Sequence, residues 1–126
     1  MTWTDFDSLT NPLLLALPEL RPVYLERQEF SGEQFGPHVV YGDILTEHFL
    51  LPLLQSPAPD DALLKRAFAF IEELAADENP PVREVVRVTV CERLGDDREC
   101  LGRAQQYMGP RTRALSDDIE KYFGRG

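Results

Sequence analysis

A chain of 126 residues with 43% apolar residues is long enough for one globular domain, which we expect to span residues 1–126. Its net charge of −9 disfavours nucleic acid as a partner, because nucleic-acid binding normally needs a basic face. The longest apolar run, residues 13–17, is far too short to cross a membrane, so we expect no membrane partner.

Two short helices are expected near the N-terminus. Residues 1–10 should form a loosely held segment with Trp3 and Phe6 as apolar anchors. A helix then begins near a proline, which suits a first helical turn, and covers residues 12–17. A second, amphipathic helix is predicted over residues 20–29.

A longer helix follows a loop. Residues 31–37 are rich in glycine and polar residues and predict the loop. The helix covers residues 39–55, and Pro52 should kink it or make it end and restart, because proline lacks the backbone donor. Residues 56–59, with two prolines, are typical of a linker between packed helices.

Residues 60–95 predict a hairpin of two helices. The first half places its apolar residues on one broad arc, and Asp60 or Asp61 can cap it. Residues 77–81 end that helix and start the next, which should run from Val82 to Leu94 and end at Gly95. The alternating valines of this second half also fit a β-strand, but its length and its start and stop signals favour a helix.

Two more helices are expected in the last quarter of the chain. Asp96 or Asp97 can cap the first of them, and a Gly-Pro pair separates it from the second. The second, over about residues 111–123, has one apolar face, made by Leu115, Ile119, Tyr122 and Phe123. We therefore predict an all-α fold, a short irregular array of stacked helical hairpins (a HEAT- or armadillo-like solenoid) with about five to seven helices.

The second helix of the predicted hairpin carries a recognisable pattern. It has an Asp-Pro start at Asp77 and Pro80, the Val82-Arg83 pair and a final Leu94-Gly95. This pattern resembles the second helix of a HEAT-type repeat.

A wider resemblance covers about residues 40–115. It rests on four segments, which are VYGDIL (40–45), RAFAFIEEL (66–74), the valine-rich helix and YMGPRT (107–112). Together they resemble a small helical family of bacteria, whose members look like the immunity proteins of polymorphic toxin systems. The resemblance implies a helical protein that binds a partner protein rather than an enzyme.

Catalytic and metal chemistry have weak support in the sequence. The only histidines, His38 and His48, belong to no metal-binding motif, and no phosphate-binding glycine loop occurs, so we expect no metal and no cofactor. We expect His48 to be packed and hydrogen-bonded beside an apolar run.

Cys91 and Cys100 form no disulfide framework, which fits a cytoplasmic protein without a signal peptide. A small hydrolase that uses Cys91 with a histidine is the weakest alternative, so we expect no enzyme.

One acidic cluster needs an explanation. Glu72, Glu73, Asp77 and Glu78 lie at the C-terminal end of a predicted helix, where the helix dipole disfavours negative charge. Glu73 and Asp77 are also a like-charge pair four residues apart. Either an arginine of the adjoining helix, Arg83 or Arg87, compensates these charges, or a basic partner surface does.

The distribution of charge fits a basic protein partner, although solubility alone accounts for it somewhat better. Residues 1–78 hold 14 acids and 4 bases, a sum of −10, whereas residues 79–126 hold 8 acids and 9 bases, a sum of +1. The candidate partner-binding residues are therefore the acidic cluster with two acids of the 39–55 helix, that is, Asp43, Glu47, Glu72, Glu73, Asp77 and Glu78.

The expected function follows from the resemblance and the charge together. We expect a toxin-neutralising immunity protein that binds a cognate bacterial toxin domain and occludes it through an acidic surface. The alternative is a HEAT-like scaffold or adaptor that binds another basic protein. The sequence leaves open the toxin's chemistry, the oligomeric state and the face of the array that binds.

Overall fold

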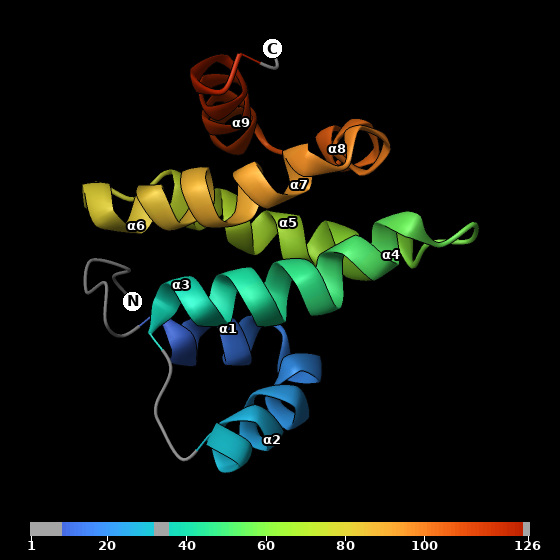
Figure 1. The fold of residues 1–126 in the computed structure, drawn as a ribbon, viewed down its shortest axis with the longest axis vertical. Coiled ribbons are helices and arrows are strands. Elements are labelled where there is room, and N and C mark those ends of the chain that lie inside the picture. Colours follow the sequence, from blue (N-terminus) through green and yellow to red (C-terminus); the bar gives the residue numbers. More distant parts are fainter. Residues whose placement is uncertain (1–8, 32–35, 125–126) are drawn as a thin grey trace.

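The computed structural model of the protein describes residues 9–31 and 36–124 (Figure 1). Over these residues it is all-helical, with seven helices and no strand. Some helices combine several segments, whose bounds are α1 (Thr10–Ala16), η2 (Pro18–Leu20), α2 (Arg21–Ser31), α3 (Pro37–Val39), η3 (Val40–Leu50), α4 (Leu51–Gln55), α5 (Asp61–Ala75), α6 (Pro80–Glu84), η4 (Val85–Cys91), α7 (Glu92–Asp96), α8 (Arg98–Gln105) and α9 (Pro110–Tyr122). The prediction of an all-α helical array is confirmed.

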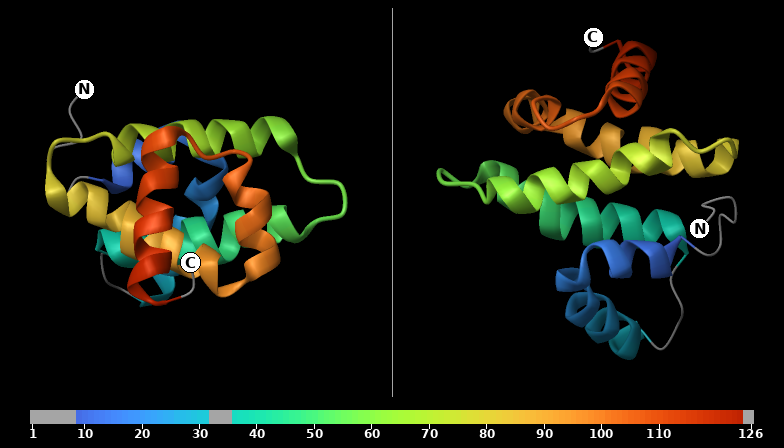
Figure 2. Two further views of the ribbon diagram at one scale, coloured as in Figure 1. Left: turned by 90° about the horizontal axis from the view of Figure 1, so that it is seen from above. Right: turned by 180° about the vertical axis from the view of Figure 1, so that it is seen from behind.

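Three antiparallel helices form the centre of the array. They are the 37–55 helix (α3, η3 and α4), α5, and the 80–96 helix (α6, η4 and α7). The 80–96 helix packs on both of the others, because α5 contacts α6 and η4, and η3 packs directly on η4. Helices α1 and α2 cover one side of this centre, and α8 and α9 cover the other (Figures 1 and 2).

The predicted hairpin of residues 60–95 is present. Asp60 caps α5 by accepting a hydrogen bond from the backbone N–H of Leu63 at 3.1 Å. The prolines at positions 80 and 81 start the next helix at its first turn. The valine-rich segment is helical, so the alternative of a strand is wrong.

Two stretches of the central helices have the wider π-helical hydrogen-bond pattern. These stretches are η3 and η4. At the end of η3, the N–H of Leu51 bonds to the carbonyl of Thr46, five residues back. Pro52 follows directly, where the π pattern of η3 gives way to the α pattern of α4, so the 37–55 helix changes its winding at the predicted position but does not end there.

The structure corrects four details of the sequence prediction. The 80–96 helix runs through Gly95, which is buried, and ends at Asp96. His48 is exposed, so the expectation of a packed side chain is wrong. Tyr122 and Phe123 are also exposed, at the C-terminal end of α9. Residue 31 belongs to α2 and residue 37 to α3, so the predicted loop is shorter than expected. The proposed anchors Trp3 and Phe6 lie outside the described residues.

The apolar core is continuous across the helices. Its largest fully buried side chains include Tyr41, Phe68, Leu13, Ile44 and Leu64, which come from α1, the 37–55 helix and α5. The hydroxyl of Tyr41 donates a hydrogen bond to the carbonyl of Leu9 at 2.9 Å, so this buried polar group is satisfied and ties the start of the described chain to the centre. Within the described residues, no helix combines the length and the apolar character needed to span a membrane.

Candidate protein-binding surface

The acids of the 37–55 helix are engaged within the molecule. Arg93, on α7, makes ion pairs with Asp43 at 3.0 Å and with Glu47 at 3.6 Å. Its guanidinium lies against Gly42, where a Cβ would come within 2.8 Å of Arg93 Cζ. Gly42 therefore makes room for an arginine that links the 37–55 helix to the 80–96 helix, and part of the charge of Asp43 and Glu47 is neutralised there.

Glu72 caps a helix that follows it in the chain. Its carboxylate accepts hydrogen bonds from the backbone N–H of Arg111 at 2.9 Å and of Thr112 at 2.8 Å, and from the Thr112 hydroxyl at 2.8 Å. These groups form the first turn of α9, the positive end of its helix dipole. A Cβ on Gly109 would lie 2.6 Å from Glu72 Oε1, so the cap requires glycine at that position.

The pKa of Glu72 reflects this geometry. Partial burial on its own would raise the pKa of the carboxyl, but the hydrogen bonds from Thr112 and Arg111 outweigh it. The net result is a pKa below the ordinary value of 4.5, so Glu72 is ionised at neutral pH.

Asp77 has a local structural role. Its carboxylate accepts a hydrogen bond from the backbone N–H of Asn79 at 2.8 Å, which holds the turn between α5 and α6. Arg83 donates to the backbone carbonyl of Asp77 at 2.6 Å rather than to the carboxylate. Arg87 binds Asp118 at 2.6 Å and Glu84 at 3.4 Å. Neither arginine makes an ion pair with a carboxylate of the acidic cluster, although Arg83 binds the backbone within it.

Glu73 and Glu78 are the two members of the cluster that face solvent. Both are exposed, on the last turn of α5 and in the turn that follows it. Among the described residues, neither makes an ion pair, whereas Asp43, Glu47, Glu72 and Asp77 all have internal partners. The structure thus divides the six predicted residues into four with structural contacts and two that leave a charge free for a partner.

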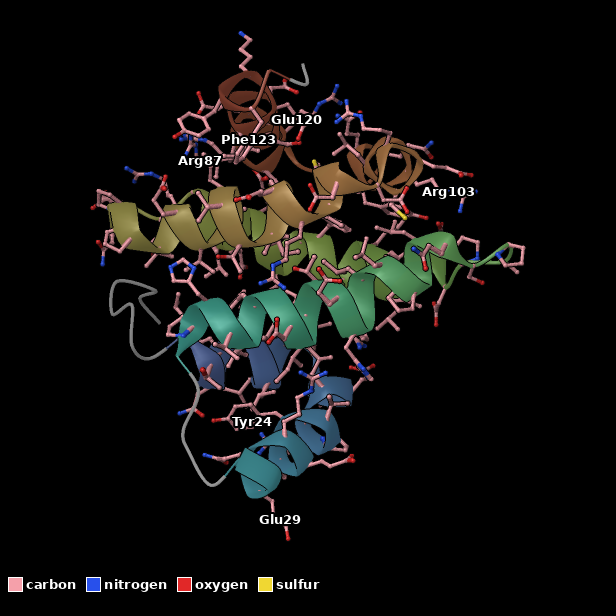
Figure 3. The ribbon with its side chains drawn as sticks, in the orientation of Figure 1. Tyr24, Glu29, Arg87, Arg103, Glu120 and Phe123 are labelled. Carbon is pink, nitrogen blue, oxygen red and sulfur yellow. The ribbon has the colours of Figure 1, made fainter. Side chains whose placement is uncertain are left out.

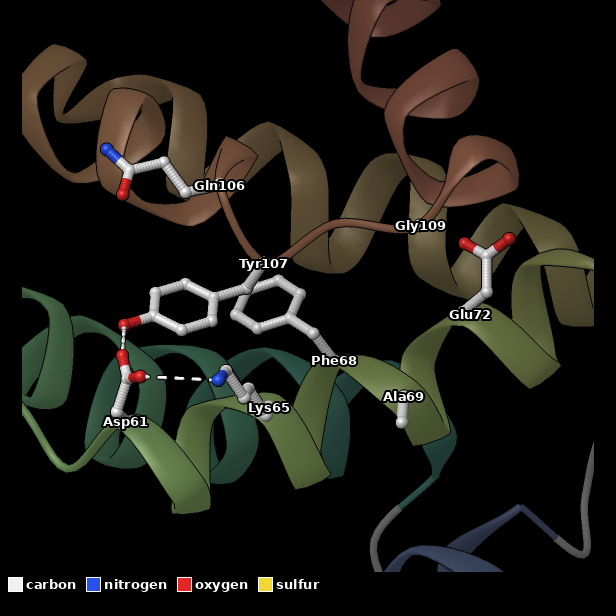
Figure 4. Close-up of a pocket in the computed structure, with 8 residues that line it drawn as sticks. All are labelled: Asp61, Lys65, Phe68, Ala69, Glu72, Gln106, Tyr107 and Gly109. Carbon is white, nitrogen blue, oxygen red and sulfur yellow. Dashed lines mark hydrogen bonds and ion pairs between the residues drawn. The ribbon is translucent and has the colours of Figure 1, made fainter.

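A groove that the sequence did not reveal lies beside α5 (Figure 4). It has a volume of about 420 Å³ and runs between α5 and the turn that joins α8 to α9. Its lining residues are Asp61, Lys65, Phe68, Ala69, Glu72, Gln106, Tyr107 and Gly109. No local pattern could have identified it, because its two walls come from segments about 40 residues apart.

A second unexpected feature is an exposed aromatic pair at the end of α9. Tyr122 is 74% exposed and its ring meets that of Phe123 edge to face at 5.2 Å. Figure 3 labels Phe123 and Arg87 in this part of the molecule. Arg87 lies over the Tyr122 ring at 5.7 Å while it holds Asp118. The pattern of α9 had placed both aromatic residues in the core.

The groups that the hydrolase alternative would use are poorly placed for it. Burial raises the pKa of the Cys91 thiol to about 12, with a contribution from Glu120, and burial and Asp97 raise that of Cys100 to about 11. Both thiols therefore stay protonated at neutral pH, and a protonated thiol is a poor nucleophile. His38 bonds to the Thr89 hydroxyl, and His48 points to solvent.

The fold and its surface define a small all-helical protein with an acidic turn and a shallow groove along one helix. The chain belongs to a family described as a domain of unknown function (DUF7674), whose profile matches residues 10–124. No curated protein and no solved structure matches the chain.

Proposed function

We propose that the protein is a toxin-neutralising immunity protein, which binds a basic surface of a cognate bacterial toxin domain and occludes it. The observation that carries the proposal is the pair of exposed acids, Glu73 and Glu78, at the turn between α5 and α6. The dipole of α5 disfavours negative charge at Glu73, and among the described residues neither acid makes an ion pair. A basic partner would supply that compensation.

The remaining surface charge supports a basic partner in general. Many of the described cations are already held by internal acids, in pairs such as Arg93 with Asp43, Arg103 with Glu99 and Arg113 with Asp117. Exposed acids such as Glu26 and Glu29 on α2 make no ion pair within the described residues. The surface offered to a partner is therefore negative. It would attract a basic protein at separations shorter than the screening length that the salt concentration sets.

The toxin itself is suggested by the resemblance of residues 40–115 to immunity proteins. The direct experiment is to express the protein with the product of the gene beside it. If the proposal holds, the two proteins co-purify, and the protein protects the host cell from growth arrest by its neighbour. If the neighbouring product is harmless or does not bind, the immunity proposal fails.

A scaffold or adaptor for another basic protein is the second candidate. The same two acids favour it, and so does the stacked arrangement of helices, which presents extended surfaces. The growth experiment separates the two candidates, because an adaptor would bind a basic partner without protecting a cell from it.

A further inference from the structure

The groove beside α5 has an aromatic wall. The rings of Phe68 and Tyr107 stack with their centroids 6.0 Å apart and an interplanar angle of 18°. Phe68 is buried and fixes the stack, while Tyr107 is only half-buried and lines the groove (Figure 4). An aromatic face that is held in place and open to a groove is a binding site for a cation, because the ring face carries negative potential.

The groove also has negative charge at both of its ends. Asp61 accepts a hydrogen bond from the Tyr107 hydroxyl, which lowers the pKa of Asp61 and keeps this carboxylate ionised and oriented. Glu72 lies at the other end, beside Gly109. These two carboxylates favour a positively charged occupant over a neutral or a negative one.

One cation of the protein already lies in the groove, but it is weakly held. Lys65 is 3.5 Å from Asp61, and the two side chains are 70% and 64% exposed. Exposed ion pairs of this kind contribute little to stability, and a lysine has a flexible stem that can swing into solvent. Lys65 therefore shows that the groove accepts a cation, and it can give way to a better one.

A second hollow indicates that the cation arrives on a protein segment. This hollow, of about 270 Å³, shares Gln106 and Tyr107 with the groove and is also lined by Leu54, Pro57 and Pro59. A free cation would use only the first site, whereas neighbouring residues of a protein segment could occupy this second hollow, which Ser56 and Arg103 also line.

We propose that the groove receives an arginine side chain of the basic protein partner, with the guanidinium stacked on Tyr107 and donating hydrogen bonds to Asp61. Arginine suits the site better than lysine because its guanidinium is planar and donates in a fixed fork. This inference rests on the proposed function, since it names the contact by which the basic partner is recognised. It assigns a binding role to two residues outside the predicted acidic surface.

The test uses the whole protein and two small probes that differ only in charge. The probes are N-acetyl-arginine methylamide and its neutral analogue N-acetyl-citrulline methylamide. Chemical shifts of the Tyr107 ring and of the Ala69 amide are followed by NMR during titration. We expect the arginine probe to shift both signals saturably and to bind at least about fivefold more tightly than the citrulline probe. Equal responses to the two probes would overturn the proposal.

Four variants assign the response to the groove. Asp61→Asn removes the charge but keeps an oxygen for the Tyr107 hydroxyl, and Tyr107→Leu removes the aromatic face. Each should weaken binding of the arginine probe at least about fivefold. The matched controls Asp117→Asn and Tyr122→Leu make the same changes at exposed positions of α9 and should leave binding unchanged. An unaltered response in Asp61→Asn would contradict the proposed site.

The competing lysine offers a gain-of-binding test. Lys65→Gln should tighten binding of the arginine probe several-fold, because it removes the cation that Asp61 now holds. Weaker binding in this variant would mean that Lys65 helps to build the site, against the proposal.

The experiments distinguish an error in the proposed arginine site from an error in the proposed function. Suppose that the basic partner binds and that Glu73→Lys weakens this binding, whereas Asp61→Asn and Tyr107→Leu do not. The proposed arginine site in the groove is then wrong, and the proposed function stands. If the arginine probe binds in the groove but the neighbouring gene product does not bind the protein, the groove is an arginine site and the proposed function is wrong.

Discussion

Gly109 allows the Glu72 carboxylate to reach the first turn of α9. Its φ of −74° is open to any residue, so the requirement for glycine is one of space. A Cβ would lie 2.6 Å from Glu72 Oε1. Gly109→Ala should displace the carboxylate and lower the free energy of unfolding by about 1–2 kcal/mol, the usual cost of losing a helix cap. Urea denaturation measures this change.

Gly102 is the control for that substitution. It lies in α8, and a Cβ there would meet nothing within 4 Å. Gly102→Ala should therefore raise stability slightly, because alanine favours a helix by about 0.5–1 kcal/mol over glycine. If the two substitutions had the same effect, the account of Gly109 would be wrong.

The Glu72 cap also predicts a dependence on pH. A carboxyl whose pKa is lower in the folded state stabilises the fold above its ordinary pKa of 4.5, and this contribution is lost as the pH falls through the folded value. Glu72→Gln should be less stable than the wild type at pH 7, and the difference should shrink below about pH 4. Thermal melts across this range measure it, and a constant difference from pH 7 to pH 3 would exclude the proposed cap.

Helix α9 shows what an amphipathic pattern can and cannot predict. The spacing of Leu115 and Ile119 located the inward face correctly, and Ile119 is buried. The same spacing put Tyr122 and Phe123 in the core, because periodicity identifies a face of a helix but not whether other elements cover its last turn. Thr112, Ser116 and Glu120 are buried polar residues that the pattern did not mark as core.

Ser116 is a weak point of the α9 interface. Its hydroxyl is fully buried and, in the described structure, has no hydrogen-bond partner. Ser116→Ala removes this desolvated group and improves helix propensity, so it should raise the free energy of unfolding by about 0.5–1.5 kcal/mol. Thr112→Val should lower it, because the Thr112 hydroxyl bonds to Glu72. A destabilised Ser116→Ala variant in urea denaturation would contradict this assignment.

At the level of the whole molecule, the helices were predictable and the function of the acids was not. Helix starts and stops depend on neighbouring residues, such as Asp60 with Leu63, and local sequence carries those signals. The partners of Glu72, Asp43 and Glu47 lie about 40–50 residues away, and only the packing of helices brings them together. The sequence identified charges without local compensation correctly, but it could not separate the internally satisfied acids from Glu73 and Glu78.

This division decides which acids a charge-reversal variant should change. Asp77→Lys would break the hydrogen bond to Asn79 and destabilise the turn, which would obscure any effect on binding. Glu73→Lys with Glu78→Lys leaves that bond intact, and a lysine at position 73 suits the negative end of α5. The control is Glu26→Lys with Glu29→Lys on α2, which changes the net charge equally in another part of the molecule. Figure 3 labels Glu29 there.

The most direct test is the rate of association with the neighbouring gene product, measured at low and high salt for the wild type and both double variants. The account predicts that Glu73→Lys with Glu78→Lys slows association at low salt by roughly tenfold or more and removes most of its salt dependence. The α2 variant should change the rate far less, and all three proteins should melt at similar temperatures. Equal slowing by both variants, or a wild-type rate that salt does not change, would contradict an acidic binding surface at the turn between α5 and α6.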